Sequence, residues 1–388
     1  MNSFVPRLCA HAFFRELILI YPFYAVMFVE SGLTGTDVSI LFAVWSASVV
    51  LLEIPTGALA DRLPRQPLLF AAQILRALGF SCWIWFPTFW GYLVGFVLWG
   101  ACSAVSSGAF EALVYDELAF ASRTDEFGRV LGRARATANL GLVSGSIAVI
   151  WLVESGYTTL LWASVLGCVV AGLLALTLPS APSARPAELR HYSQILLEAR
   201  SLVSRGGPLL ALIVFSAVST SLPQTLDEYW TVFGAEVGLP KRLLGPLLAA
   251  VYVVQAVGSW TAHRFSGASH HTLYMLFAAS GVLIALAGWI ADLVSLLLLL
   301  WFVIVTTVVE VLLEVRLQDA LPTGVRATVS SVRNLANELT GIVVFLIMGV
   351  IVTGITFAPG LLVFGLFISA FGLAFRIARV RFPISDAS

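Results

Sequence analysis

Charged side chains are scarce in this sequence of 388 residues, at 11% of the total, and Lys241 is its single lysine. Soluble proteins carry about 25% charged residues. Because so few charges cannot cover the surface of a soluble globule, the composition excludes a protein made of two or three soluble domains. The 22 basic and 22 acidic side chains balance, so no net field favours nucleic acid as a partner.

The motifs of ATP-driven transport and of intramembrane catalysis are also missing. The sequence has no GxxxxGK[ST] loop for ATP and neither HExxH nor GxSxG, the motifs of metalloproteases and serine hydrolases. Its four cysteines, Cys9, Cys82, Cys102 and Cys168, lie in apolar stretches without CxxC spacing, which indicates neither a disulfide framework nor a metal site. We therefore expect no enzyme, no cofactor and no metal, and an energy source in an ion or substrate gradient.

Apolar residues are abundant, at 59% of the sequence, and the mean hydropathy is +0.94. A helix needs about 20 such residues to cross the hydrocarbon of a lipid bilayer. The chain divides into twelve stretches of this kind, separated mostly by short connectors. The sequence thus predicts an all-α polytopic membrane protein with transmembrane helices at 8–29, 38–59, 68–87, 91–118, 134–154, 157–178, 208–232, 243–263, 272–291, 293–316, 329–353 and 357–378.

The long connector 180–207 divides the predicted helices into two groups of six. We expect an N-terminal six-helix bundle at 1–179, a cytoplasmic interdomain loop at 180–207 and a C-terminal six-helix bundle at 208–388. Arginines crowd the connectors on one side of the predicted membrane, whereas the other side has only Lys241 and Arg242. Because cytoplasmic loops retain basic residues, both chain termini are expected in the cytoplasm.

The two halves contain an internal repeat. Residues 51–62 match 253–264 at an offset of 202, which aligns Glu with Gln, Gly with Ser and Arg with Arg. Nearly the same offset aligns the pairs Pro22/Pro223, Glu111/Glu310, Arg135/Arg333 and Asn139/Asn337. Because each half has six helices, the halves share one membrane orientation and are expected to be parallel repeats.

The connector after the second predicted helix carries Gly57-Ala-Leu-Ala-Asp61-Arg62-Leu-Pro-Arg65, preceded by Glu53-Ile-Pro-Thr. This segment resembles the G-x-L-a-D-r-x-g-r signature of the major facilitator superfamily and its ExPTG extension in bacterial members. The resemblance implies two bundles related by a pseudo-twofold axis along the membrane normal, alternating access, and a bacterial inner membrane. It also implies that Gly57, Asp61, Arg62 and Arg65 form a conformational latch; the alternative is a capped turn with orienting arginines.

A glycine pattern lies in the fifth predicted helix. Gly132, Gly141 and Gly145 have the spacing of a helix-5 motif that resembles antiporters of the same superfamily, with Ser146 in place of its proline and 149–150 in place of its last glycines. Small residues four positions apart also let two helices approach closely. Gly141 and Gly145 are therefore predicted to be packing residues, with the antiporter interpretation left open.

Carboxylates inside the predicted helices are candidates for proton coupling. An ionised side chain in the bilayer costs at least about 2.5–3.5 kcal/mol on insertion scales, so it must face protein or water. A buried carboxylate can load and release a proton. We expect Glu111 to have this role, with Glu53 and Asp116 as further candidates; the alternative for Glu111 and Glu53 is a structural ion pair with Arg15 or Arg76 that holds the N-terminal bundle together.

If the resemblance holds, the first, fourth, seventh and tenth helices line a central cavity that leans acidic. Pro22 and Pro223 favour kinks on two of these helices, and aromatic side chains beside them are able to stack on an organic cation, although they also suit the membrane interface. The predicted cavity residues are Arg15, Glu16, Phe23, Tyr24, Tyr115, Gln224, Asp227, Tyr229, Trp230 and Glu310.

These features predict a monomeric secondary active transporter in a lipid bilayer, with protons and a small-molecule substrate as its partners. Proton-coupled efflux of a small amphipathic or cationic organic compound is the leading hypothesis, because acids and aromatics line the expected cavity. Proton-coupled or facilitated uptake of a small metabolite is the alternative. A non-transporting membrane receptor or scaffold is a third, more remote hypothesis.

Overall fold

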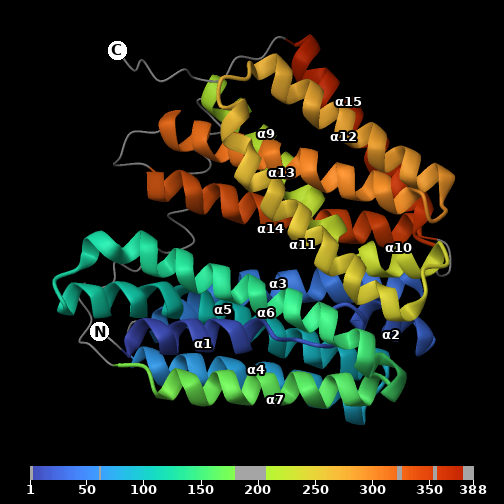
Figure 1. Ribbon diagram of the computed structural model, residues 1–388. Coiled ribbons are helices and arrows are strands. Elements are labelled where there is room, and N and C mark those ends of the chain that lie inside the picture. Colours follow the sequence, from blue (N-terminus) through green and yellow to red (C-terminus); the bar gives the residue numbers. More distant parts are fainter. Residues whose placement is uncertain (1–2, 61–62, 180–206, 321–325, 353–355, 379–388) are drawn as a thin grey trace. The chain divides into compact units, whose positions relative to one another are not determined.

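A computed structural model of the protein describes residues 3–60, 63–179, 207–320, 326–352 and 356–378 (Figure 1). The main elements in these ranges are α-helices, which are labelled as in Figure 1. Their bounds are α1 Phe4–Glu16, α2 Tyr24–Glu30, α3 Gly35–Ala60, α4 Arg65–Trp85, α5 Phe89–Phe120, α6 Phe127–Leu152, α7 Tyr157–Leu176, α9 Pro208–Asp227, α10 Trp230–Glu236, α11 Leu244–Thr261, α12 His270–Ile290, α13 Ser295–Ala320, α14 Arg326–Ile351 and α15 Ala358–Ile377.

The chain folds into two compact units. Unit 1 comprises Met1–Leu33, Ile40–Leu189 and Lys241–Ala249, and unit 2 comprises Thr34–Ser39, Arg190–Pro240 and Ala250–Ser388. Residues 34–39 thus belong to unit 2 and residues 241–249 to unit 1, whereas the sequence predicts bundles at 1–179 and 208–388. In the described residues, unit 1 is built around α1 to α7, and unit 2 around α9, α10 and α12 to α15 with most of α11.

Ten helices in the described residues are long and apolar enough to cross a membrane, and they correspond to ten of the twelve predicted spans. The predicted span 8–29 is not continuous but is divided into α1 and α2. The predicted span 329–353 corresponds to α14, in whose described part the apolar segment is Leu335–Ile351.

The interruption between α1 and α2 covers residues 17–23 and includes Pro22. Proline lacks the backbone N–H that would continue the helical hydrogen bonds. Side chains from other helices replace the missing bonds: Ser164 Oγ on α7 accepts from Ile20 N at 3.0 Å, and Arg76 on α4 donates to Arg15 O at the end of α1. Inside a membrane, such partners are what make irregular backbone tolerable.

Glycines of α6 and α7 pack closely against the backbone at the end of α1 and at the start of this interruption. A Cβ atom on Gly141 would lie 2.2 Å from Phe13 O, and one on Gly167 would lie 2.8 Å from Leu17 O. Gly145 is less crowded, at 3.6 Å from Ile18 N. Glycine at Gly141 is therefore a requirement of packing, because any larger side chain would overlap the backbone of α1.

Unit 2 repeats the pattern of a divided first helix. The segment that begins with α9 is interrupted after Asp227 and resumes as α10 at Trp230. Here Pro223 lies inside α9, four residues before its end, where its missing N–H weakens the last turn. The matched prolines of the sequence repeat therefore accompany matched interruptions, although at slightly different positions.

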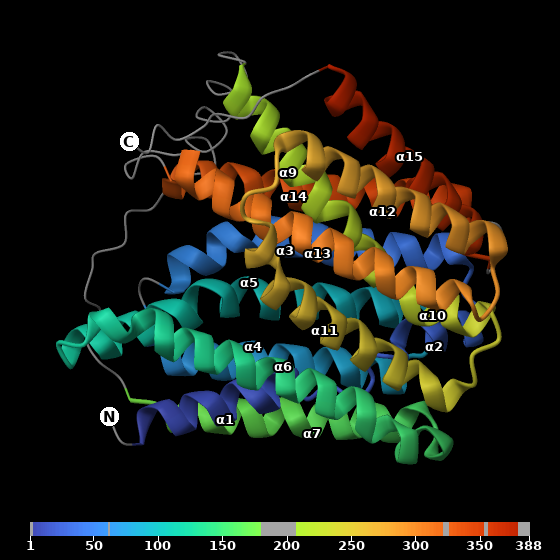
Figure 2. The same cartoon turned by 45° about the horizontal axis from the view of Figure 1, so that its top comes forward.

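Aromatic side chains fill the core of unit 1. Tyr24 of α2 contacts Phe42 of α3 and Phe96 of α5 edge-on, with ring centroids 5.8 and 5.9 Å apart. Trp83 of α4 packs 5.1 Å from Phe28. Such edge-to-face pairs stabilise the core beyond the area they bury. Helices α2 to α5 carry this cluster, and the ribbons of α3 and α5 lie beside each other in both views (Figures 1 and 2).

In unit 2, α12 and α15 make the most extensive helix pair, in which glycine again allows a close approach. A Cβ on Gly281 of α12 would lie 2.6 Å from Gly365 O of α15. A cluster around Phe215 of α9, whose ring lies 4.9 Å from that of Tyr274, joins this pair to the rest of the unit. Small residues at contacts and large apolar ones facing outward are typical of helices in lipid.

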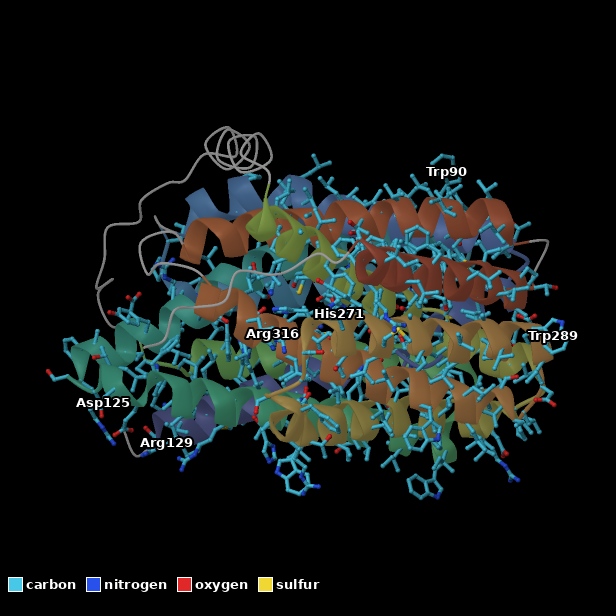
Figure 3. The ribbon with its side chains drawn as sticks, turned by 90° about the horizontal axis from the view of Figure 1, so that it is seen from above. Trp90, Asp125, Arg129, His271, Trp289 and Arg316 are labelled. Atoms are coloured by element: carbon cyan, nitrogen blue, oxygen red, sulfur yellow. The ribbon has the colours of Figure 1, made fainter. Side chains whose placement is uncertain are left out.

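Side chains on the outside of unit 1 follow the expected membrane pattern (Figure 3). Trp90, at the first turn of α5, is 71% exposed, as are many apolar side chains along the helices. Asp125 and Arg129 lie at the opposite end of the unit and are also exposed (Figure 3). An exposed apolar middle flanked by tryptophan and charged residues is the surface that a bilayer stabilises.

Candidate functional site

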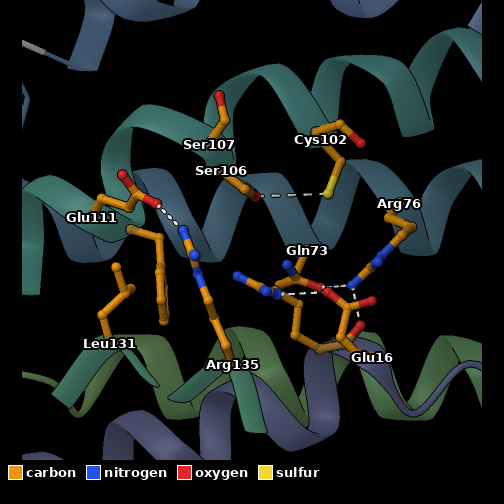
Figure 4. A pocket seen from close by; sticks show the side chains of 12 residues that line it. Glu16, Gln73, Arg76, Cys102, Ser106, Ser107, Glu111, Leu131 and Arg135 are labelled. Carbon is orange, nitrogen blue, oxygen red and sulfur yellow. Dashed lines mark hydrogen bonds and ion pairs between the residues drawn. The ribbon is translucent and has the colours of Figure 1, made fainter. Parts of the chain in front are cut away.

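Unit 1 contains a polar cavity of about 260 Å³ between the end of α1 and helices α4, α5 and α6 (Figure 4). Three arginines and two glutamates contribute to its wall, so its formal charge is one unit positive. The lining residues are Arg15, Glu16, Gln73, Arg76, Cys102, Ser103, Ser106, Ser107, Phe110, Glu111, Leu131 and Arg135.

Two of the three arginines at this cavity are paired with the glutamates. Arg15 Nε lies 2.8 Å from Glu16 Oε1, and the Arg15 guanidinium also lies over the ring of Phe110, 4.9 Å from its centroid. Arg135 on α6 reaches Glu111 on α5 with 2.8 Å between Nη2 and Oε1 (Figure 4). Glu111 is thus in an ion pair, but its partner is Arg135 and not Arg15 or Arg76, the two arginines that the sequence suggested.

The third arginine, Arg76, is 4% exposed and has a different environment. It donates to Arg15 O and, at 2.6 Å, to Gln73 Oε1, and it also bonds the side chain of Cys168. In the described part of the chain, no carboxylate oxygen lies within 4.0 Å of its nitrogens. Its Nε and the neighbouring Gln73 Nε2 are buried, and neither has a hydrogen-bond partner among the residues that the structure describes. Arg76 is therefore the surplus positive charge of this cavity.

Unit 2 contains a larger cavity, of about 510 Å³, between α9, α11, α13 and α14. Its charges have the opposite balance, with three carboxylates and one guanidinium. The lining residues are Thr220, Gln224, Asp227, Gln255, Ser259, Thr307, Glu310, Val311, Glu314, Val315 and Arg333.

Asp227 is the last residue of α9, immediately before the interruption, and its two oxygens accept bonds from neutral donors. Trp230 Nε1 lies 2.5 Å from Oδ1, and Gln255 Nε2 lies 3.2 Å from Oδ2. Among the ion pairs of the described residues, none includes Asp227. A carboxylate held by neutral groups at a cavity is able to bind a proton or a cation without first losing an ionic partner.

The other two carboxylates of this cavity lie one helical turn apart on α13. Glu310 Oε1 accepts from Gln224 Nε2 at 3.2 Å. Glu314 is paired with Arg333 of α14. After this pairing, Asp227 and Glu310 give the cavity two negative charges that no described basic side chain neutralises by direct contact.

The two units share a pair between an acid and an arginine on neighbouring helices. In unit 1 the pair is Glu111 with Arg135, and in unit 2 it is Glu314 with Arg333. The arginines are equivalent in the sequence repeat, but the repeat equivalent of Glu111 is Glu310, one turn away from Glu314. In unit 2 the acid paired with the arginine is therefore Glu314, and Glu310, one turn away, is a second acid at the cavity.

The other proton-coupling candidates lie away from the two cavities. Asp116 is 7% exposed, with Oδ2 at 3.7 Å from Arg65 Nε. Glu53 lies on the exposed surface of α3. Tyr115, expected in the substrate cavity, packs edge-on against Phe127, with ring centroids 5.9 Å apart. Of the three candidates, Glu111 alone lines a cavity described here.

Most of the predicted aromatic cavity residues are packed in the cores. Phe23 and Tyr24 are 0% and 4% exposed, and Tyr229 is fully buried against Phe357, with ring centroids 5.6 Å apart. Trp230 differs, because its indole N–H donates a hydrogen bond to Asp227 Oδ1. These aromatics therefore belong to the packing of α2 and α10, with Trp230 connecting that packing to the unit 2 cavity.

The predicted latch is described in part. Gly57 lies in the last turn of α3, and Arg65 is the first residue of α4. Asp61 and Arg62 lie outside the described residues. The contact between Arg65 and Asp116 joins the start of α4 to the end of α5, two helices of the same unit.

Several polar cavity residues were not predicted at a site, among them Gln73, Arg76 and Gln255. A polar pair three residues apart on an otherwise apolar helix, as with Gln73 and Arg76, places both on one face and was a usable signal. Gln255 was considered in the sequence only as the repeat counterpart of Glu53, so its own place at the cavity was not predicted. In the described residues, no group of three or more His, Cys, Asp or Glu side chains is placed to hold a metal ion.

Comparisons with known proteins agree on the fold. A family model described as Major Facilitator Superfamily matches residues 9–345. The nucleoside transporter NupG superposes with a TM-score of 0.75 at 14% identity over 97% of this chain and 98% of its own. A POT family peptide transporter gives 0.76 at 12% identity, over 99% and 98% of the two chains. A D-xylose-proton symporter gives 0.68 at 15% identity over the same shares. No curated protein sequence matches the chain.

Proposed function

Because the chain belongs to the major facilitator superfamily, and so is a multi-pass membrane transporter of small molecules and not an enzyme, we propose that it exports a small cationic or amphipathic organic compound in exchange for protons. We further propose that it works as a monomer in the bacterial inner membrane, with both termini in the cytoplasm. The observation that carries the proposal is the unit 2 cavity, where carboxylates outnumber basic groups three to one.

Asp227 is proposed as the group where proton and cation compete. Its oxygens are held by Trp230 and Gln255, which are neutral, so its charge is available to a ligand in the cavity. A proton and an organic cation would neutralise the same carboxylate, and binding of one would weaken binding of the other. Such competition couples an inward proton to an outward cation.

Glu310 and Glu111 have different proposed roles. Glu310 lines the same cavity as Asp227 and, among the described residues, is held by a hydrogen bond from Gln224 alone, which supports a role in attracting the cation. Glu111 is engaged by Arg135, so protonation would have to break an ion pair. Asp227 therefore replaces Glu111 as the first candidate for proton coupling, with Glu53 and Asp116 as weaker ones.

The Arg65–Asp116 contact supports the proposed latch. Arg65 belongs to the signature segment, and Asp116 is a nearly buried carboxylate at the far end of α5. An ion pair at 3.7 Å is loose enough to be exchanged for another partner. We propose that the segment from Gly57 to Arg65 makes and breaks such pairs as the transporter changes conformation.

Uptake of a small metabolite is the second candidate. The observation that favours it is the positive balance of the unit 1 cavity, where Arg76 has no carboxylate partner among the described residues. An anionic metabolite would suit that cavity, whereas an organic cation would not. The two candidates therefore differ in the sign of the substrate as well as in direction.

Transport by purified protein in liposomes tests the proposal. An outward-directed or inward-directed pH gradient is imposed, and the flux of tetraphenylphosphonium or ethidium is followed together with lumenal pH. Cation flux should require the pH gradient and should carry protons in the opposite direction. Asp227→Asn should lose the coupling, while the same change at exposed Asp125, Asp125→Asn, should leave it intact.

Two results would count against this function. Cation flux in the wild type that ignores the pH gradient would remove proton coupling. Unchanged coupling in Asp227→Asn would show that another residue binds the proton. Glu111→Gln and Glu310→Gln are the next variants to test.

A further inference from the structure

The charge of Arg76 needs an anion that the described part of the protein does not supply. A buried charge is expensive unless it is paired and hydrogen-bonded. At 4% exposure, Arg76 is satisfied in part by Arg15 O, Gln73 Oε1 and the side chain of Cys168, none of which is anionic at its ordinary protonation. Glu16 also lines the cavity, but its carboxylate is engaged by Arg15.

Two buried donors beside this charge have no acceptor among the described residues. Arg76 Nε and Gln73 Nε2 belong to residues that line the cavity, and in the described part of the chain neither atom has a hydrogen-bond partner. The two side chains extend from α4 and converge next to Glu16 (Figure 4). An unmet buried donor costs about 1–3 kcal/mol, so two of them at one cavity favour a ligand with acceptor oxygens.

The rest of the wall fits an organic acid. Ser103 and Ser106 supply hydroxyl groups, while Phe110 and Leu131 supply an apolar surface. The cavity volume is about 260 Å³, whereas a water molecule takes about 30 Å³ in the liquid, so there is room for much more than a halide ion. One surplus positive charge matches a single negative charge on the ligand.

We propose that the unit 1 cavity binds the carboxylate group of a small organic monoacid, with Arg76 as its ionic partner and Gln73 as a second donor. Guanidinium is the side-chain group best suited to a carboxylate, because its donors form a planar fork that matches two oxygens. The inference does not depend on cation export, because the cation was assigned to a separate cavity in unit 2.

Thermal unfolding of the full-length protein in detergent tests this site, with benzoate as the probe. Benzoate should raise the unfolding temperature in a concentration-dependent way at millimolar concentrations. Benzamide, the neutral compound of the same shape, and sodium chloride at equal concentration should not. An equal shift with chloride would show a site for any anion and would overturn the assignment to a carboxylate, as would no shift with benzoate.

Two variants connect the effect to the cavity. Arg76→Gln should raise the dissociation constant of benzoate at least about tenfold, because hydrogen bonds to charged groups contribute about 1.5–3 kcal/mol. The matched control is Arg129→Gln, on the exposed side of α6 (Figure 3), which should bind benzoate as the wild type does.

Arg76 also holds the end of α1, so Arg76→Gln is at risk of misfolding. Ser106→Leu avoids this problem, because it fills the cavity from α5 and leaves the bond between Arg76 and Arg15 in place. Loss of the benzoate shift in Ser106→Leu supports the site. Retention of the full shift in both folded variants, or in Ser106→Leu alone if Arg76→Gln does not fold, overturns it.

Discussion

Arg135 on α6 is ion-paired with Glu111 on α5 across 2.8 Å, and both side chains are more than half exposed, at 68% and 51%. The pair lies at the rim of the unit 1 cavity, not deep inside it. This exposure limits what the pair contributes to stability, since water and salt screen its attraction. It also supports the proposal that Asp227, and not Glu111, is the first candidate for proton coupling.

The stability of the Glu111–Arg135 pair can be measured with a double-mutant cycle. We expect Glu111→Gln and Arg135→Gln each to change the free energy of unfolding by less than about 1 kcal/mol, with a coupling energy in the same range. Denaturant unfolding at low and high salt is the measurement. A coupling energy of several kcal/mol that resists salt would mean that the pair is buried in the functional state.

Transport measurements on Glu111→Gln and Asp227→Asn show which of these two residues carries the proton. Glu111→Gln should keep at least part of its proton-coupled flux, because the cavity in unit 2 is untouched. Asp227→Asn should lose coupling, because its carboxylate is replaced by an amide that cannot ionise. Fluxes of the two variants in the same liposome assay decide between the residues, and loss in Glu111→Gln alone would restore Glu111 as the carrier.

Two glycines on α6 should respond in opposite ways to the same substitution. Gly141→Ala puts a methyl group 2.2 Å from Phe13 O and should destabilise unit 1 by about 1–3 kcal/mol, as other overpacked contacts do. At Gly132 no atom lies within 4 Å of the added Cβ, so Gly132→Ala should stabilise the helix by about 0.5–1 kcal/mol. Thermal unfolding of both proteins tests the difference; equal effects would contradict the close approach of α1 and α6.

Glu236 should stabilise the start of α15. Its carboxylate accepts from Phe357 N at 2.6 Å and weakly from Ala358 N at 3.4 Å, the first free N–H groups of that helix. Glu236→Ala should cost about 0.5–2 kcal/mol, the usual loss for a removed helix cap. Glu154→Ala, at an exposed position, should stay within about 0.5 kcal/mol of the wild type in the same unfolding measurement.

Hydrophobic runs predicted most of the architecture, because the length of an apolar run decides whether a helix can span the bilayer. Ten of the twelve predicted spans are confirmed in the described residues. Pro22 predicted a kink, but the full interruption at 17–23 was not predicted, since its residues are as apolar as the helices around them. It depends on Pro22 together with contacts from α6 and α7, and a hydropathy profile contains no information on such contacts.

Of the residues predicted for the candidate sites, the charged and amide side chains lie mainly at the cavities and most of the aromatic ones do not. Arg15, Glu16 and Glu111 lie at one cavity, and Gln224, Asp227 and Glu310 lie at the other, because charged groups within apolar helices must face protein or water. Their functional roles remain predictions. Phe23, Tyr24 and Tyr229 are core residues instead, because an aromatic ring is equally suited to a cavity wall and to a core, and sequence alone does not give its direction.

The interruption between α1 and α2 is enforced from outside as well as by Pro22. Gly141 and Gly167 let α6 and α7 approach the backbone at Phe13 and Leu17, and Ser164 accepts a hydrogen bond from Ile20 N inside the interruption. We therefore expect α1 and α2 to remain separate helices when Pro22 is replaced by alanine. Because contacts from α6 and α7 hold the interruption as well as Pro22 does, a related protein without this proline could keep the same bend.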